Sequence, residues 1–373
     1  MNILAIRMDN IGDVVMVEPA LRAIRKAYPQ AKLTLLASPA GSQVAPLIPW
    51  VDQVISWRAS WQELSEGYAH QPSEDEELIQ QLRAGHYDLA LIFTSFTQSA
   101  YPPAYACYLA GIPNRVGMST EFGGAILTRW VKPPEIAEHQ VERNLSLIKA
   151  LGIPLDGTDI RLTIPPDVDI QADKLLQSLG IVEGTPFVTL LAGASASARR
   201  YPAQRYRQVA EGLVERAGVK VLLLGTSKEK EHIEPVIQAV DNRNIFSLIG
   251  ETDVPLFAAL ISKSALVVAN NSSGLHFADA FHRPMVILYS GTEYRSQWAP
   301  RNSPAILLKR ETRCSPCFKL DCPYQMECLD IEPDEVTRLS VDLLKKNLAL
   351  QAGSNHLLVE DLYKNAINGY GSP

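Results

Sequence analysis

Residues Ile3–Val15 read ILAIRMDNIGDVV, and this stretch decides the fold class. Its apolar run, Ile3–Ile6, predicts a buried strand, and an amphipathic helix is predicted directly after it, over Val14–Ala27. Asp13 stands in the tight turn between them. In an open α/β sheet, ligands bind beyond the carboxyl ends of the strands. Asp13 is therefore a candidate general base that takes a proton from an attacking hydroxyl. The alternative is that Asp13 is the N-cap of the helix.

Composition limits the class of protein. A chain of 373 residues is too long for one ordinary core, so we expect two domains. The net charge of -6 argues against binding nucleic acid through a global positive field. No apolar run approaches the length of about 20 residues that spans a bilayer, and the N-terminus lacks the pattern of a signal peptide. We expect a cytoplasmic protein that could still act at the membrane surface on a lipid-linked substrate.

Strands and helices alternate along the first half of the chain. Further strands are predicted at Lys32–Ala37, Gln53–Trp57 and Asp88–Phe93, and a helix is predicted from Ser73 onward. The last of these strands is a continuous apolar run of the kind that is buried in parallel sheets. Alternation of this kind implies crossover connections and a doubly wound sheet.

A linker with two prolines divides the chain at Leu162–Asp167. The alternation then restarts at a strand, Phe187–Leu191, and closes with Pro284–Tyr289. The sequence thus predicts an α/β protein with two Rossmann-like domains, residues 1–165 and 166–350, that face a cleft. Such interfaces are favoured sites for small molecules. The C-terminal helix, Asp334–Leu350, is expected to pack back on the first domain, and residues 351–373 are expected to form a weakly ordered tail.

The loop Asn270–Ala278 follows a buried strand and opens a helix. Small residues there leave backbone N–H donors free at a helix N-terminus, which suits an anion such as a diphosphate. The candidate residues of this loop are Ser272, Ser273, Gly274 and His276. The alternative is ordinary capping by Asn271 or Ser272, with His276 hydrogen-bonded in the wall.

Two further loops follow strands of the second half. Gly193–Pro202 carries Arg199 and Arg200, and an arginine side chain matches phosphate oxygens with its planar group of donors. Solvated surface arginines are the alternative. Gly225–Glu231 holds acids that could bind a ribose hydroxyl, although a solvated helix start explains them as well.

Four cysteines fall close together, with the spacing Cys314-x2-Cys317-x4-Cys322-x5-Cys328. Four thiols so close in a cytoplasmic protein favour a structural, tetrahedral zinc site, and disulfides or free thiols are the alternatives. The spacing differs from that of the common ferredoxin motifs. Cys107 stands apart and is expected to be a buried apolar residue.

With these motifs the chain resembles the heptosyltransferase-like proteins of glycosyltransferase family 9, over roughly residues 1–340. The resemblance rests on Arg7–Val15, Pro19–Ile24 and Tyr28–Pro29 in the first half. In the second half it rests on Arg199–Pro202, Gly250 before a predicted helix, and Asn270–Ala278. The paired front and back motifs are more specific than either alone. The resemblance implies the two-domain GT-B fold, with the acceptor bound by residues 1–165 and the donor by residues 166–350.

The resemblance also implies an activity: inverting transfer of a sugar from a nucleotide-diphospho-sugar, most commonly ADP-heptose, without a catalytic metal. The acceptor would be a glycan or a lipid-linked molecule, as in lipopolysaccharide synthesis. By this resemblance Asp13 is the base, and variable loops at Phe93–Tyr105 and Arg115–Arg129 are where acceptor contacts are expected. The donor-binding residues would be Gly12, Arg199, Arg200, Asn271, Ser272, Ser273, Gly274 and His276.

The chain departs from the family pattern in its second half. Asn271 stands where the family usually has Asp, Ser273 stands where it has Gly, and Tyr201 stands where it has Trp. Two alternatives to a transferase stay open at this point. One is a sugar-nucleotide epimerase, which needs further acids or histidines, and the other is a non-catalytic nucleotide-sugar-binding protein.

Overall fold

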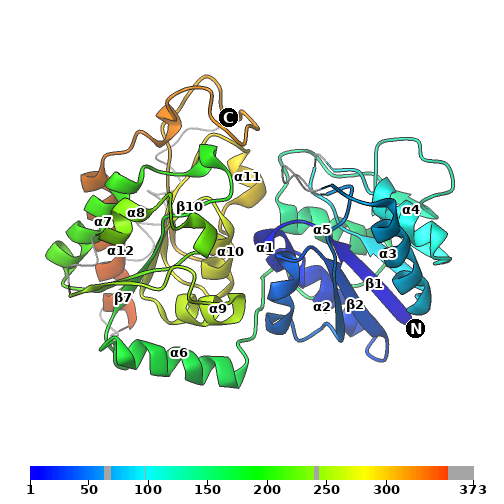
Figure 1. Cartoon of the computed structure of the whole chain (residues 1–373), viewed down its shortest axis with the longest axis horizontal. Coiled ribbons are helices and arrows are strands. Elements are labelled where there is room, and N and C mark those ends of the chain that lie inside the picture. Colours follow the sequence, from blue (N-terminus) through cyan, green and yellow to red (C-terminus); the bar gives the residue numbers. More distant parts are fainter. Residues whose placement is uncertain (63–68, 97, 239–242, 352–373) are drawn as a thin grey trace. The chain divides into compact units, whose positions relative to one another are not determined.

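The computed structural model describes residues 1–62, 69–96, 98–238 and 243–351, so the predicted tail beyond residue 351 lies outside the described residues. The chain folds into two compact units, whose elements are labelled in Figure 1. The first unit comprises Met1–Pro166 and a separate short segment, Tyr294–Ala299. The second comprises Asp167–Glu293 and the described residues from Pro300 onward.

The first unit is built on a parallel sheet of six strands in the order β3-β2-β1-β4-β5-β6. The central strand β1 pairs with β2 at Ile3 and Leu33 and with β4 at Ile3 and Leu89. The strands are β1 (Asn2–Arg7), β2 (Lys32–Ala37), β3 (Gln53–Ser56), β4 (Leu89–Ile92), β5 (Asn114–Met118) and β6 (Arg129–Val131). The helices are α1 (Ile11–Val15), α2 (Glu18–Ala27), η1 (Gly41–Leu47), α3 (Pro72–Ala84), α4 (Tyr101–Leu109) and α5 (Gln140–Ala150).

The first helical region differs from the prediction. The single helix expected over Val14–Ala27 is two helices, α1 and α2, which are separated at Met16 and Val17. Pro19 lies in the first turn of α2, where its missing N–H costs nothing, and it favours a new helix start there. The Asn144 side chain of α5 donates to the Met16 carbonyl at 2.9 Å, which satisfies a polar group at the break.

The predicted loop Arg115–Arg129 is also wrong at both ends. Arg115 lies within β5 and Arg129 begins β6, two strands that the sequence did not reveal. Both strands are short and interrupt their apolar residues with arginine, asparagine or glycine. Pairing with the edge of an existing sheet stabilises them, and that is a tertiary effect.

The second unit repeats the topology with the sheet order β12-β11-β10-β7-β8-β9. Its strands are β7 (Phe187–Leu191), β8 (Lys220–Leu223), β9 (Ile245–Ser247), β10 (Leu266–Asn270), β11 (Met285–Leu288) and β12 (Ala305–Leu308), the last of which was not predicted. Its helices are α6 (Pro166–Ser178), η2 (Ser197–Arg199), α7 (Ala203–Ala217), η3 (Ser227–Glu229), α8 (Glu234–Ile237), α9 (Val254–Lys263), α10 (Ser273–Ala280), η5 (Glu327–Leu329) and α12 (Pro333–Gln351).

Both sheets have the strand order of the Rossmann fold, which confirms the predicted fold class. In this order the direction of winding reverses between the first and fourth strands of each sheet. Ligands bind at that switch point, beyond the carboxyl ends of the two strands. The switch points lie between β1 and β4 in the first unit and between β7 and β10 in the second.

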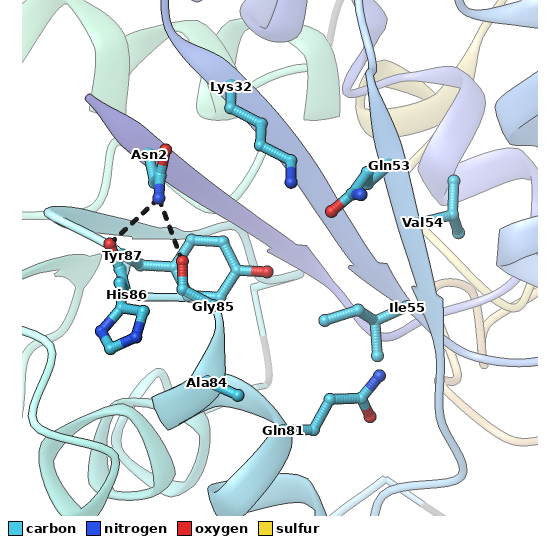
Figure 2. Close-up of a pocket in the computed structure, with 10 residues that line it drawn as sticks. All are labelled: Asn2, Lys32, Gln53, Val54, Ile55, Gln81, Ala84, Gly85, His86 and Tyr87. Carbon is cyan, nitrogen blue, oxygen red and sulfur yellow. Dashed lines mark hydrogen bonds between the residues drawn. The ribbon is translucent and has the colours of Figure 1, made fainter.

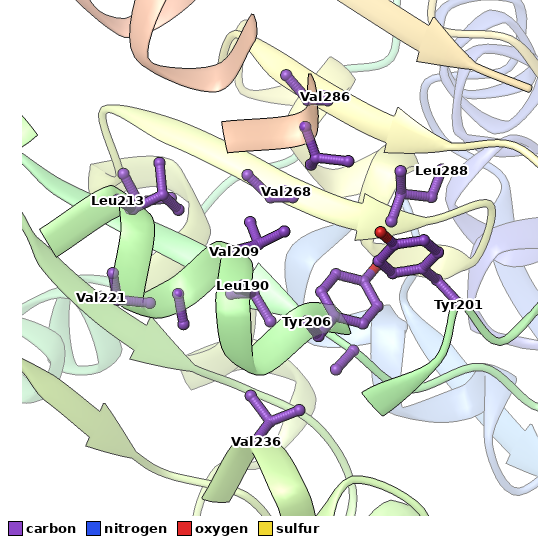
Figure 3. Close-up of a cluster of buried hydrophobic side chains, with 14 of the residues drawn as sticks. Leu190, Tyr201, Tyr206, Val209, Leu213, Val221, Val236, Val268, Val286 and Leu288 are labelled. Carbon is purple, nitrogen blue, oxygen red and sulfur yellow. The ribbon is translucent and has the colours of Figure 1, made fainter. Parts of the chain in front are cut away.

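The core of the second unit lies between its sheet and the helices α7 and α12. Figure 3 shows Tyr206, Val209 and Leu213 of α7 lying over Leu190 and Val268 of the sheet, in a cluster of buried side chains. The C-terminal helix α12 belongs to the second unit, and the expectation that it packs on the first domain stays a prediction. It packs against α7 because its buried apolar residues, Val336, Val341 and Leu344, belong to the core of the second unit.

The segment Tyr294–Ala299, which contains α11 (Arg295–Trp298), is held in the first unit by two hydrogen bonds. Gln297 donates to the Ile136 carbonyl. The His139 ring accepts the Val141 N–H at Nδ1, 3.2 Å away, so Nε2 carries the proton that is shared with the Ala299 carbonyl at 3.1 Å. His139 is thereby fixed as one neutral tautomer.

Asn270, at the end of β10, is fully buried and links three parts of the second unit. Its Oδ1 accepts the Tyr201 N–H at 3.1 Å and the Tyr206 hydroxyl at 3.0 Å. Its Nδ2 donates to the carbonyls of Ala192 at 2.8 Å and Gly193 at 3.3 Å. The chain that follows β7 and the start of α7 are thus attached to the end of β10.

We predict that Asn270→Ala destabilises the protein by about 3 kcal/mol, because it leaves several buried donors and acceptors unpaired. Urea unfolding followed by circular dichroism measures this loss. Asn302→Ala is the matched control, since Asn302 is exposed and its truncation should change stability by less than about 0.5 kcal/mol. Equal stability of the two variants would contradict the role given to Asn270.

Candidate functional site

Asp13 lies at the switch point of the first unit, in the first turn of α1. Its carboxylate accepts a hydrogen bond from Arg7 Nη2 at 2.7 Å. Arg7 is the last residue of β1 and is fully buried, and its Nη2 also donates to Ser95 Oγ, beyond β4, at 2.9 Å. One guanidinium therefore joins the chain after β1 to the chain after β4.

Asp9 is a second carboxylate on the same arginine. Its Oδ2 lies 3.0 Å from Arg7 Nε, and its Oδ1 accepts from Gln62 Nε2 at 2.9 Å and from Gln98. Asp9 is nearly buried, whereas the Asp13 side chain keeps 15% of its surface exposed. Of the two acids, Asp13 is the one that a ligand can reach more readily.

Burial is the main influence on the pKa of Asp13, and it raises that pKa above its ordinary value of 3.8. The charge of Arg7 opposes this effect and the charge of Asp9 adds to it. The capping alternative predicted for Asp13 is wrong, because Asn10 is the N-cap residue and Asp13 lies inside the helix. A carboxylate with a raised pKa is better matched to accepting a proton than an ordinary aspartate is.

Arg143 of α5 brings a second buried cation to this centre. Its Nε donates to the Thr94 carbonyl at 3.1 Å. Burial, and to a smaller extent the charge of Arg7, lower the pKa of Arg143 to about 10. Arg7, Asp9 and Arg143 were not predicted from the sequence to be site residues. A charged residue at the end of an apolar strand, as at Arg7, is the signal that could have revealed the first of them.

In the second unit, Arg199 and Arg200 lie beyond β7, at the switch point, but they make different contacts. The Nε of Arg200 donates to the Ala194 carbonyl at 2.8 Å, and its Nη2 lies 3.3 Å from the Ser195 carbonyl. Arg200 therefore stabilises its own loop. Arg199 reaches the chain beyond β11, where Nε donates to Thr292 Oγ1 at 3.3 Å and Nη2 donates to Glu293.

The predicted anion loop lies beyond β10, across the same switch point. Ser272 is the N-cap residue of α10, with its side chain in no capping hydrogen bond, so the alternative of capping by its hydroxyl is not realised. Gly274 packs closely on β7, because a Cβ on it would lie 2.1 Å from Leu191 Cδ1 and would force that side chain to move. Ser272 and Ser273 are half-buried, and His276 is buried in α10.

Asn271 is buried, and its Oδ1 accepts the Ser290 N–H at 3.1 Å. Within the described part of the chain, its Nδ2 has no hydrogen-bond partner. Buried amide groups are rarely left unpaired in proteins. This nitrogen therefore marks a place where an oxygen atom of a ligand would be stabilised.

In the loop Gly225–Glu231, the acid Glu229 forms contacts within its own loop. Glu229 Oε2 accepts from the Thr226 N–H at 2.7 Å and the Thr226 hydroxyl at 3.1 Å, forming a capping box for η3. The carboxylate also crowds Gly193, where a Cβ would lie 2.0 Å from Glu229 Oε1. The helix-start interpretation of this loop is the one that the contacts favour.

The four clustered cysteines lie in the second unit, and all are free thiols. Burial raises the pKa of Cys328 first, and the thiols of Cys322, Cys314 and Cys317 raise it further, so the four are neighbours. Across the described residues, no three His, Cys, Asp or Glu side chains are gathered as ligands of one metal ion. The thiols are close but are not arranged as a preformed metal site.

Cys107 is fully buried in the first unit, and burial raises the pKa of its thiol to about 12, as suits an inert apolar residue. A hollow of about 570 Å³ also lies in this unit, at the amino-terminal edge of the sheet. Figure 2 shows Asn2, Lys32 and Gln53, which begin β1, β2 and β3, around it. This is the edge opposite to Asp13, where ligands of such sheets do not usually bind.

The structure thus brings the predicted residues together in two groups. Asp13 and Gly12 lie in the first unit. Those in the second unit follow β7 (Arg199 and Arg200) or β10, where they lie in the loop and the first turns of α10 (Asn271, Ser272, Ser273, Gly274 and His276). No helix of the described residues is long and apolar enough to cross a membrane.

Comparison with known proteins gives a consistent result. The model of glycosyltransferase family 9 (heptosyltransferase) matches residues 76–327, more than half of the chain. Lipopolysaccharide heptosyltransferase 2 of Escherichia coli K12 is 26% identical over 347 residues, covering 90% of this chain and 96% of that protein.

Two solved structures share the fold. That of the E. coli ADP-heptose lipopolysaccharide heptosyltransferase II matches with a TM-score of 0.75 and 23% identity, over 94% of this chain and 100% of that one. A glycosyltransferase family 9 protein of Veillonella parvula matches with a TM-score of 0.77 and 20% identity, over 92% of this chain and 97% of that one.

The raised pKa of Asp13 predicts how Asp13→Asn changes stability with pH. The folded protein holds this proton to a higher pH than the unfolded chain, so wild-type stability falls as pH rises from 3.8 through the raised pKa. The amide cannot ionise, so the stability of the variant relative to wild type should increase over that window and then stay constant. Urea unfolding of both proteins between pH 3.5 and about 8 measures the difference. A difference that does not change with pH would contradict the assignment.

Proposed function

This chain belongs to glycosyltransferase family 9, and we propose that it transfers a heptose from ADP-heptose to a lipopolysaccharide-type acceptor. The curated relative described above is named a lipopolysaccharide heptosyltransferase, and its solved counterpart is named for ADP-heptose. The observation that carries the proposal is the Asp13 carboxylate, held by Arg7 at 2.7 Å at the switch point of the first unit with its pKa raised by burial.

We propose that the second unit binds the diphosphate of the donor. Arg199 supplies a cation, and the N-terminus of α10 at Ser272 and Ser273 supplies backbone N–H donors. Both lie at the switch point between β7 and β10. The unpaired Nδ2 of Asn271 would donate to an oxygen of the bound donor, a role that the aspartate usual in the family cannot fill.

The reaction then follows from these groups. An acceptor hydroxyl loses its proton to Asp13 as its oxygen bonds to the anomeric carbon, from the face opposite the leaving group. The bond from that carbon to the diphosphate breaks, and the electron pair leaves with the nucleoside diphosphate. Arg199 and the α10 N–H groups stabilise the growing negative charge, an effect worth several kcal/mol in such sites. The configuration of the sugar is inverted, and the mechanism assigns no step to a metal.

For the acceptor, we propose a glycan on a lipid, presented at the inner face of the cytoplasmic membrane. The relative's name, lipopolysaccharide heptosyltransferase, supports this choice of acceptor. In this chain, Ser95 and Gln98 join the segment beyond β4 to the Arg7 and Asp9 centre. An acceptor held by this loop would place a hydroxyl near Asp13.

Asp13→Asn tests the function. We expect the variant to lose at least about a hundredfold in kcat for heptose transfer from ADP-heptose to a deacylated lipopolysaccharide core, since a general base contributes about that much or more. Its Kd for ADP, measured by calorimetry, should stay unchanged because the proposed donor loops lie in the other unit. Wild-type protein that binds ADP without turnover would instead support a non-catalytic binding protein. Acceptor-independent conversion of the donor sugar would support an epimerase.

We also propose that the four clustered cysteines bind a structural zinc ion. Four thiols within one short segment supply the soft ligands that zinc prefers, and their mutual proximity at Cys328 supports the proposal. The thiols would have to close around the ion, because the described residues do not hold a preformed site. The ion would fix this segment and take no part in the chemistry.

Metal analysis tests the zinc proposal. Protein purified without chelator should contain about one zinc ion per chain, and Cys314→Ser should lower that content. Removal of the metal should lower the melting temperature and make four additional thiols reactive. Metal-free protein with all four thiols freely reactive as purified would overturn the proposal, and Cys107, being buried, serves as the unreactive internal control.

A further inference from the structure

The side chain of Glu293 forms an ion pair with Arg199, the residue that we propose binds the donor diphosphate. Arg199 Nη2 donates to Glu293 Oε1, and Arg199 Nε donates to Thr292 Oγ1 at 3.3 Å. Both charged side chains are largely buried, with 23% of the Arg199 surface and 15% of the Glu293 surface exposed. The Glu293 carboxylate therefore accepts the hydrogen bond from Arg199 Nη2 that a phosphate oxygen would otherwise accept.

The backbone that carries Glu293 is fixed by its neighbours. The Cys317 N–H donates to the Gly291 carbonyl and the Phe318 N–H donates to the Thr292 carbonyl, both at 2.9 Å. The Thr292 hydroxyl also lies 3.0 Å from Ser290 Oγ. Glu293 thus follows directly on a loop segment whose backbone is held by hydrogen bonds.

Carboxylate and phosphate oxygens compete for the same guanidinium donors. A diphosphate that reaches Arg199 meets the negative charge of Glu293 at close range, and like charges in a partly buried site repel strongly. Binding of the diphosphate at Arg199 Nη2 therefore requires that the ion pair between Arg199 and Glu293 be broken at that atom.

We propose that Glu293 is an internal competitor of the donor diphosphate. It holds Arg199 in place while the site is empty, yields Nη2 when the diphosphate binds, and takes it back as the nucleoside diphosphate product leaves. The inference rests on the proposed function in assigning the diphosphate to Arg199. Its consequence is weaker binding of the diphosphate product, which favours product release.

Glu293→Gln removes the charge and keeps the size of the side chain. We expect the Kd values for ADP and for inorganic pyrophosphate, measured by calorimetry, to fall about tenfold, the scale of coupling between close charges. Glu311→Gln is the matched control. It removes the same charge from an exposed side chain, 3.6 Å from Lys309, and should leave both Kd values unchanged.

The variant Arg199→Gln tests whether the effect of Glu293 depends on the guanidinium of Arg199. In that background Glu293→Gln should bring no gain in affinity, because the competition takes place on the guanidinium. An unchanged or higher Kd in Glu293→Gln would overturn the inference, since it would mean that Glu293 merely orients Arg199 for the ligand. An equal gain in the Arg199→Gln background would also overturn it. Tighter pyrophosphate binding by Glu293→Gln without any heptose transfer by wild type would support the inference and count against the proposed function.

Discussion

The geometry of the second unit depends on the buried hydrogen bonds of Asn270. Its amide uses both its oxygen and its nitrogen, binding Tyr201 and Tyr206 on one side and the chain after β7 on the other. A buried amide with every group satisfied specifies one arrangement, because any displacement leaves a donor or acceptor unpaired. The loop with Arg199 begins after β7, at the two carbonyls that Asn270 binds, and the loop with Ser272 begins directly after Asn270. Asn270 therefore sets the separation of these two loops.

The two units solve the problem of buried charge differently. In the first, Arg7 balances two carboxylates, and burial keeps the pKa of Asp13 raised despite the nearby cation. In the second, Arg199 has an acidic partner on a neighbouring loop, Glu293, and backbone N–H groups provide the rest of the positive potential. The first arrangement suits the movement of a proton, and the second suits the binding and release of an anion.

Much of the fold could be predicted because buried parallel strands have a strong sequence pattern. β1, β4, β7 and β10 consist mainly of apolar residues, and their alternation with helices indicates the fold class. β5 and β6 escaped prediction because arginine, asparagine or glycine stands among their apolar residues. β12 is apolar but only four residues long, and so short a run has no decisive period. Asp13 and Arg199 could be proposed from their positions after strands. The pairing of Glu293 with Arg199 could not be predicted, because an ion pair between residues far apart in the sequence has no local pattern.

The segment Tyr294–Ala299 means that neither unit is a continuous piece of the chain. A fragment ending at Pro166 would lack the residues that contact His139 and Ile136, and a fragment starting at Asp167 would carry them without those neighbours. Exchange of halves between homologues, a common way to combine the specificities of two-domain enzymes, would therefore mismatch this segment unless it travels with the N-terminal half. The modularity suggested by two similar sheets is therefore incomplete, and the segment Tyr294–Ala299 sets its limit.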